Sequence, residues 1–74
     1  MEHRISLKDD FIKLGQALKA AHIVMSGGEA KERIAAGEFK VNGETETRRG
    51  RKLYAGDRVK CGEDEILIVE NKTN

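Results

Sequence analysis

The spacing of apolar residues changes from a helical to a strand pattern at Gly37, and this change restricts the chain to mixed folds. Before Gly37, apolar side chains recur every three or four residues, as on one face of a helix. After Gly37 they alternate, and Asn42-Gly43 supplies the residues that a type I′ hairpin turn favours. A chain of 74 residues forms one domain with a small core, expected over residues 1–74. Helices followed by strands predict an α+β fold.

Two helices are expected before the change of pattern. The second is expected over residues 27–36, because Ser26 and Glu29 fit a capping box in which each side chain bonds the other's backbone N–H. Gly37 follows its last residue, where a left-handed C-cap is expected. The first is expected to begin at an N-cap on Asp9 or Asp10 and to present one apolar face to the core. The residues of that face are Phe11, Leu14, Leu18 and Ala21.

Short strands are expected after the helices. The run Ile66 to Val69 is continuously apolar, which indicates a strand paired in the middle of the sheet or covered on both faces. A further short strand can precede the helices at residues 4–7. The four strands expected after the helices are residues 39–41, 44–47, 58–61 and 65–70.

Positive charge is concentrated in the segment Arg48-Arg49-Gly50-Arg51-Lys52. Residues 31–60 hold nine basic and five acidic residues, a net charge of +4, whereas residues 61–74 hold one basic and four acidic residues, a net charge of −3. A basic middle region attracts a polyanion such as nucleic acid, although a solvated charged loop is the alternative. These cations lie outside the apolar pattern, so we expect their replacement to leave the fold intact.

Two features near this segment suit a nucleic-acid ligand. Ser26, Gly27 and Gly28 place a helix N-terminus and two glycines where a phosphate can approach, although such glycines also make a plain turn between helices. Tyr54 is a candidate for stacking on a base, with a partly buried position beside a strand as its alternative. Both phenylalanines are expected to face the core. With clustered cations and few aromatic platforms, the surface is predicted to prefer folded over single-stranded RNA.

The composition argues against several classes of protein. No stretch approaches the roughly 20 apolar residues of a membrane span, and the first residues have no secretory apolar region, so we expect a cytoplasmic protein. A single cysteine, Cys61, excludes an internal disulfide and cannot by itself form a metal site. His3 and His22 are far apart and lack paired carboxylates. We therefore expect no enzyme activity, cofactor, metal or small-molecule substrate.

The segment from Leu14 to Val59 contains S-x-x-E-A-K, then G-x-x-x-V-N-G, then K-L-x-x-G-D. In these motifs the chain resembles the S-four RNA-binding domain, named after ribosomal small-subunit protein four and also called the alpha-L motif. It is most similar to the small stand-alone bacterial members of the YaaA type. The resemblance implies two short helices packed on a small, bent, mainly antiparallel sheet. Many family members carry a basic residue where Gly27 stands in this chain.

The resemblance also implies a non-catalytic protein, monomeric by default, that recognises structured RNA through shape and phosphate. Ribosomal RNA or an assembling ribosomal subunit is the expected ligand. A protein-interaction module or a DNA-binding accessory protein using the same basic surface remains the alternative, because phosphate contacts carry no sequence information. Lys31 and Arg33 are expected at exposed positions of the second helix. The RNA-facing residues implied are Lys31, Arg33, Lys40, Arg48, Arg49, Arg51 and Lys52.

Overall fold

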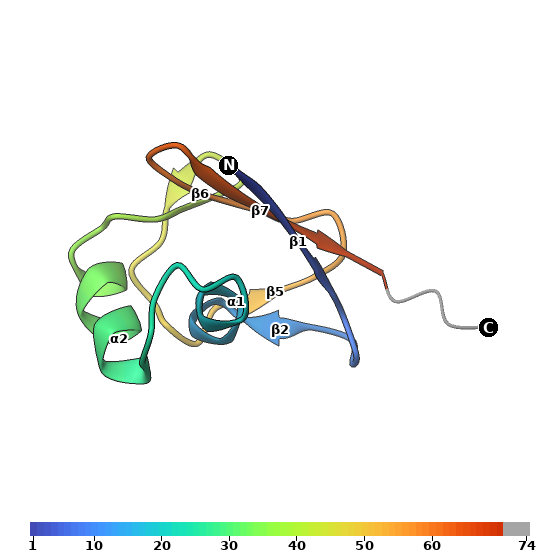
Figure 1. Cartoon of the computed structure of the whole chain (residues 1–74), viewed down its shortest axis with the longest axis horizontal. Coiled ribbons are helices and arrows are strands. Elements are labelled where there is room, and N and C mark those ends of the chain that lie inside the picture. The colour runs from blue at the N-terminus through green and yellow to red at the C-terminus, as the bar shows by residue number, and fades with distance from the viewer. Residues whose placement is uncertain (71–74) are drawn as a thin grey trace.

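The computed structural model describes residues 1–70, which form two helices and seven short strands (Figure 1). The order confirms the predicted α+β class, with two strands before the helices and five after them. The strand expected at residues 4–7 is present but begins two residues earlier. The elements are β1 (Glu2–Ser6), β2 (Ile12–Lys13), α1 (Leu14–Ala20), α2 (Gly27–Ala35), β3 (Lys40–Val41), β4 (Glu44–Thr45), β5 (Lys52–Leu53), β6 (Arg58–Cys61) and β7 (Asp64–Val69).

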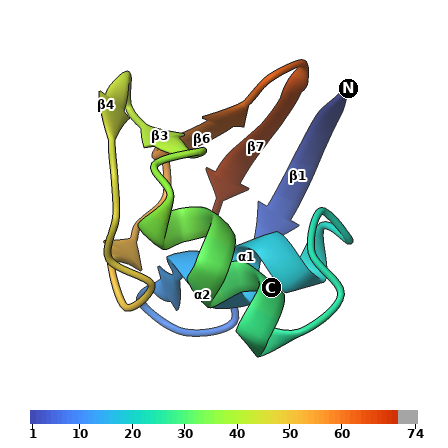
Figure 2. The same ribbon diagram turned by 90° about the vertical axis from the view of Figure 1, so that its left-hand side faces the viewer.

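The main sheet has five strands in the order β1-β7-β6-β3-β4 (Figure 2). β1 runs parallel to β7, whereas the other neighbours are antiparallel, so the sheet is mainly antiparallel as predicted. β7 lies between β1 and β6, which confirms that the last apolar run is paired in the middle of the sheet. Ile66 and Ile68 on its inner face are buried, while Leu67 and Val69 on its outer face are only partly covered.

A second, two-stranded sheet joins β2 to β5, with Ile12 opposite Leu53. This sheet is not predictable from the sequence pattern, because two residues are too few to show a hydrophobic period. β2 leads directly into α1, so this pairing brings the segment after the hairpin to the beginning of α1. That connection positions the basic segment.

α1 begins later than predicted, and neither Asp9 nor Asp10 is its cap. The N-cap is Lys13, whose backbone N–H donates to Oε1 of Gln16 at 3.1 Å. The preceding residues cannot be helical because β2 pairs in an extended conformation with β5. Phe11 lies before the helix and is only partly buried, so the prediction that it faces the core is wrong.

α2 confirms the predicted capping of its first turn. The backbone N–H of Glu29 donates to Oγ of Ser26 at 3.1 Å. The return bond differs from the prediction, because Oε1 of Glu29 accepts from the backbone N–H of Met25 at 2.8 Å instead of from Ser26. Gly37 ends the helix at φ +79°, as predicted, and its N–H donates to the carbonyl of Ile34 at 2.9 Å.

The hairpin between β3 and β4 also has the predicted turn, with φ +51° at Asn42 and +88° at Gly43. The Asn42 side chain bonds the turn before β6: its Nδ2 donates to Oδ1 of Asp57 at 3.0 Å, and its Oδ1 accepts from the backbone N–H of Arg58 at 2.9 Å. Oδ2 of Asp57 accepts from the N–H of Tyr54 at 2.7 Å. Asp57 is thus a turn residue.

The core lies between the inner face of the sheet and the two helices, which Figure 2 shows below the strands. Phe39 is fully buried, as predicted. Within residues 1–70 the one buried charged residue is Glu46, with 6% exposure. The largest fully buried side chains are Phe39, Leu14, Leu18, Ile34, Leu53, Ile66, Ile68, Val24, Val41 and Val59.

Neither helix in the described part of the chain is long and apolar enough to cross a membrane.

Candidate nucleic-acid interface

The basic loop, residues 48–52, is hydrogen-bonded to the first turn of α1. The N–H of Leu14 donates to the carbonyl of Arg51 at 2.8 Å, and the N–H of Gly15 donates to the carbonyl of Arg49 at 3.1 Å. N–H groups in the first turn have no partner inside a helix, so the loop satisfies them. A Cβ on Gly15 would lie only 2.8 Å from Cγ of Arg49, and glycine therefore permits this close approach. The loop backbone is thereby held in place against α1.

The buried carboxylate of Glu46 holds two of the loop arginines. Its Oε2 accepts from the N–H and Nε of Arg48 at 3.1 and 2.9 Å, and its Oε1 accepts from Nη1 of Arg51 at 2.7 Å. The side-chain hydrogen bonds from Arg48, and then those from Arg51, lower the pKa of Glu46 from 4.5 to about 2. Replacing both arginines would leave a buried carboxylate unpaired. Arg48 and Arg51 therefore contribute to the stability of the fold as well as to its surface charge, and the expectation that their replacement leaves the fold intact stays a prediction.

A groove of about 340 Å³ lies between the two helices and the basic loop. Lys13 and Lys19 line it from the two ends of α1, and Arg49 lines it from the loop. Among residues 1–70, no acidic side chain lines this groove, so it attracts anions. The charge pattern of the sequence does not single out Lys13 and Lys19, because basic and acidic residues balance in the first thirty positions. Only the packing of the loop against α1 brings them together with Arg49.

The N-terminus of α2 opens onto this groove. Gly27 lines it, and a Cβ built on Gly27 would meet no atom within 4 Å. Gly28 is similarly open, with only Oγ of Ser26 nearby at 3.9 Å. Packing therefore does not require glycine at either position. Lys31 is exposed, as expected, and lies one turn after Gly27 on the same side of α2.

Arg33 differs from Lys31, because its guanidinium is part of the packing. Its side chain is 29% exposed, and Nε donates to Oε1 of Glu38 at 2.9 Å. Nη1 donates to the carbonyl of Ile23 at 3.1 Å, and the guanidinium lies 5.2 Å from the centre of the Phe39 ring. The hydrogen bond to Glu38 raises the pKa of Arg33 above its usual value. The expectation of an exposed side chain is wrong here.

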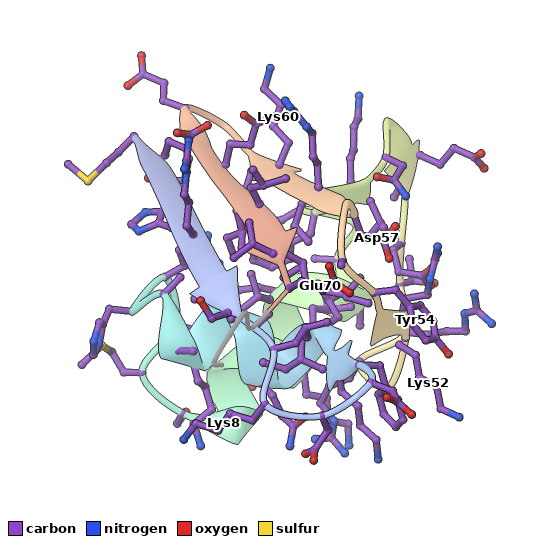
Figure 3. All side chains as sticks on the ribbon, turned by 90° about the vertical axis from the view of Figure 1, so that its right-hand side faces the viewer. Lys8, Lys52, Tyr54, Asp57, Lys60 and Glu70 are labelled. Atoms are coloured by element: carbon purple, nitrogen blue, oxygen red, sulfur yellow. The ribbon has the colours of Figure 1, made fainter. Side chains whose placement is uncertain are left out.

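Lys40 lies on β3 and not beside the cations of the basic loop. It pairs in register with Lys60 of β6, and both are exposed on the outer face of the sheet, whereas Val41 and Val59 face the core. Figure 3 shows Lys60 on the upper part of the sheet, away from Lys52 beside the loop. The outer face therefore carries its own pair of cations.

Tyr54 follows β5 and is 49% exposed, so it does not occupy the partly buried position considered as its alternative role. Its ring centre lies 6.0 Å from that of Phe11, and the two planes are inclined at 54°. Nζ of Lys52 lies 4.8 Å from the centre of the Phe11 ring on the loop side. An exposed aromatic ring therefore borders the basic loop, and Figure 3 shows Tyr54 next to Lys52.

The remaining reactive side chains are dispersed. His22 is exposed at φ +61°, and Nε2 of His3 lies 3.5 Å from Oδ1 of Asp64. Cys61 is partly buried against the core, and its Sγ lies 3.6 Å from Nη2 of Arg33. Among residues 1–70, no three His, Cys, Asp or Glu side chains are grouped so that they could hold a metal ion.

Comparison with known proteins adds two findings. The family described as the S4 domain matches residues 5–69 of this chain, which include both helices and the basic loop. A protein of Bacillus subtilis (strain 168) named probable ribosome maturation protein RlbA is 49% identical over 57 residues. Those residues are 77% of this chain and 80% of the Bacillus protein.

Proposed function

This chain belongs to the S4 domain family, as its motifs had indicated, and we propose that it is a non-catalytic cytoplasmic protein that binds structured RNA. The observation that carries the proposal is the groove lined by Lys13, Lys19 and Arg49, with no acidic side chain from the described part of the chain among its lining residues. The name of the Bacillus relative refers to ribosome maturation. Ribosomal RNA, free or in an assembling ribosomal subunit, is therefore the proposed ligand.

The way in which these cations are held favours folded RNA over a flexible strand. α1 and the loop are joined by backbone hydrogen bonds, and Glu46 holds the side chains of Arg48 and Arg51. Charges held in fixed positions bind best to phosphates that are also in fixed positions, because neither partner then loses much conformational freedom. Paired RNA presents such phosphates across its grooves. One copy of the domain carries this whole surface, so a monomer suffices for binding.

The members of the RNA-facing set have different roles in this proposal. In this proposal exposed Lys31, one turn after Gly27 on α2, contacts phosphate directly, together with Arg49 and Lys52. Arg48 is bonded to Glu46 but remains 75% exposed, so it contributes charge to the surface as well. Arg33 supports the end of α2 and its connection to the sheet. The open N-terminus of α2 at Ser26, Gly27 and Gly28 completes the groove and receives one phosphate of the bound helix.

A pair of double variants tests this surface. Lys13→Ala with Arg49→Ala removes two charges from the groove and leaves the Glu46 network in place. Lys40→Ala with Lys60→Ala removes two charges from the outer face of the sheet and serves as the matched control. The groove variant should lose at least about 10-fold in affinity for a purified RNA hairpin. The plot of log affinity against log salt should become shallower by roughly 1.4 to 1.8, for two lost phosphate contacts.

The control variant should change affinity by no more than about 2-fold, a free energy within the usual range for exposed substitutions. Equal losses in both variants would mean that net charge, and not this groove, determines binding. A DNA hairpin of the same sequence should bind more weakly, because it lacks the 2′-OH groups and A-form shape. Direct binding to purified RNA, with no other protein present, separates this function from a protein-interaction module. Crosslinking to cellular RNA followed by sequencing would identify the RNA.

A further inference from the structure

The half-exposed ring of Tyr54 is held in a defined position by the turn that follows it. The backbone N–H of Tyr54 donates to Oδ2 of Asp57 at 2.7 Å, and the N–H of Asp57 donates to the carbonyl of Tyr54 at 3.0 Å. The tilted ring of Phe11 supports Tyr54 from the side, at 6.0 Å between ring centres. The ring therefore stays in place without being covered, as a rigid aromatic platform requires.

Two hollows of opposite character meet at Tyr54. On one side, a hollow of about 480 Å³ is lined by Arg48, Arg51 and Lys52 together with the ring. On the other side, a hollow of about 680 Å³ contains three carboxylates, those of Asp9, Asp10 and Glu70, and one basic side chain, that of Lys8. Figure 3 shows Tyr54 with Lys52 on one side and the labelled Glu70 and Lys8 on the other.

This division determines what can reach the ring. Phosphates are attracted into the basic hollow and repelled from the acidic one. A nucleobase is uncharged and presents a flat π-face, so it can lie on Tyr54 while the phosphates beside it contact the loop. A base inside a continuous helix is stacked between its neighbours and has no free face. Only an unpaired base can therefore occupy this position.

We propose that Tyr54, supported by Phe11, stacks on one unpaired base of the bound RNA, with the flanking phosphates on Arg51 and Lys52. The inference rests on the proposed RNA-binding function and specifies its ligand as a helix interrupted by a bulge, loop or junction. Unpaired nucleotides of this kind are the usual targets of aromatic side chains in RNA recognition. One platform reads one base, and stacking tolerates any base because each has a π-face.

Three RNAs of equal length test the proposal: a perfectly paired hairpin, the hairpin with one bulged nucleotide, and the bulged hairpin with an abasic site at the bulge. The native protein is compared with Tyr54→Leu, which removes the ring, and with Tyr54→Phe, which keeps it. Circular dichroism of each variant checks that the fold is retained. A second bulged hairpin carries 2-aminopurine at the bulge, because its fluorescence is quenched when an aromatic ring stacks on it.

The native protein and Tyr54→Phe should bind the bulged hairpin on the order of 10-fold more tightly than the abasic one, as expected for one stacked base. Tyr54→Leu should lose this preference and the quenching, while its affinity for the perfect hairpin stays within about 2-fold of the native value. Equal affinity of the native protein for bulged and abasic RNA would overturn the stacking proposal while leaving the proposed function in place. A preference retained in Tyr54→Leu would overturn it as well. If the native protein binds none of the three RNAs, both proposals are wrong.

Discussion

Replacing Glu46 by Gln removes one negative charge from the centre of the basic loop while nearly preserving the shape of the side chain. In the native structure both carboxylate oxygens accept hydrogen bonds, from Arg48 and from Arg51. Glutamine keeps one oxygen acceptor and turns the other position into an NH2 donor, which then faces a donor of an arginine. The substitution therefore tests whether the charge of Glu46 stabilises the fold.

The size of the effect follows from the pKa of Glu46, which the arginines lower from 4.5 to about 2. At 1.36 kcal/mol per pKa unit, this difference of about 2.5 units corresponds to at most about 3 to 4 kcal/mol. The side chain of Arg48 is 75% exposed and that of Arg51 is 34% exposed, so solvent screens part of the interaction. We therefore expect Glu46→Gln to lower the free energy of unfolding by about 1 to 2 kcal/mol at pH 7.

The effect must also depend on pH in a defined direction. Because the pKa of Glu46 is lower in the folded than in the unfolded state, the carboxylate contributes its full stabilisation above about pH 5. This contribution is lost as the pH falls through 4.5 and toward 2. The same linkage relation predicts that, at pH 3, less than about half of the difference in the free energy of unfolding between the native protein and Glu46→Gln remains.

Urea unfolding followed by far-UV circular dichroism at pH 7 and pH 3 measures these differences. Glu44→Gln on β4 is the matched control, because Glu44 is an exposed carboxylate on the same hairpin. It should change the free energy of unfolding by less than about 0.5 kcal/mol at either pH. An unchanged stability of Glu46→Gln at pH 7, or a loss of the same size at both pH values, would refute the reasoning.

Four further substitutions separate scaffold from surface. Ser26→Ala should lower the free energy of unfolding by about 0.5 to 2 kcal/mol through loss of the α2 cap, and a melt of normal stability would contradict this role. Arg33→Ala should lower the free energy of unfolding by about 1 to 3 kcal/mol through its lost hydrogen bonds, whereas Lys31→Ala should lower it by less than about 0.5 kcal/mol and weaken RNA binding. Urea titrations and binding curves measure the two effects, and a stability loss in Lys31→Ala with none in Arg33→Ala would contradict these roles. Gly27→Arg should raise RNA affinity about 3- to 10-fold and increase the salt dependence without loss of stability, since it adds one phosphate contact at a position with open space.

The sequence by itself determined the features that depend on neighbouring residues. The α2 cap at Ser26, the left-handed end of that helix at Gly37 and the turn at Asn42-Gly43 were all predicted from residue type and spacing. Each is decided within about five residues, because the side chain or the freedom of glycine acts on the adjacent backbone. The sequence also showed the concentration of charge in the loop and the motifs that indicate the family of the chain.

Tertiary structure decided which of the charged residues meet. Nothing in the spacing of Lys13 and Lys19 indicates that they share a groove with Arg49, because the contact forms only when the two-residue strands β2 and β5 pair. Such short strands show no hydrophobic period, so β2 cannot be recognised in the sequence, and the start predicted for the first helix is too early. Glu46 is ordinary in sequence and becomes a buried partner of Arg48 and Arg51 only when the loop folds back over it. The groove depends on contacts between segments some thirty or more residues apart, and the burial of Glu46 depends on which side of a loop faces the core. Local propensity encodes neither of these.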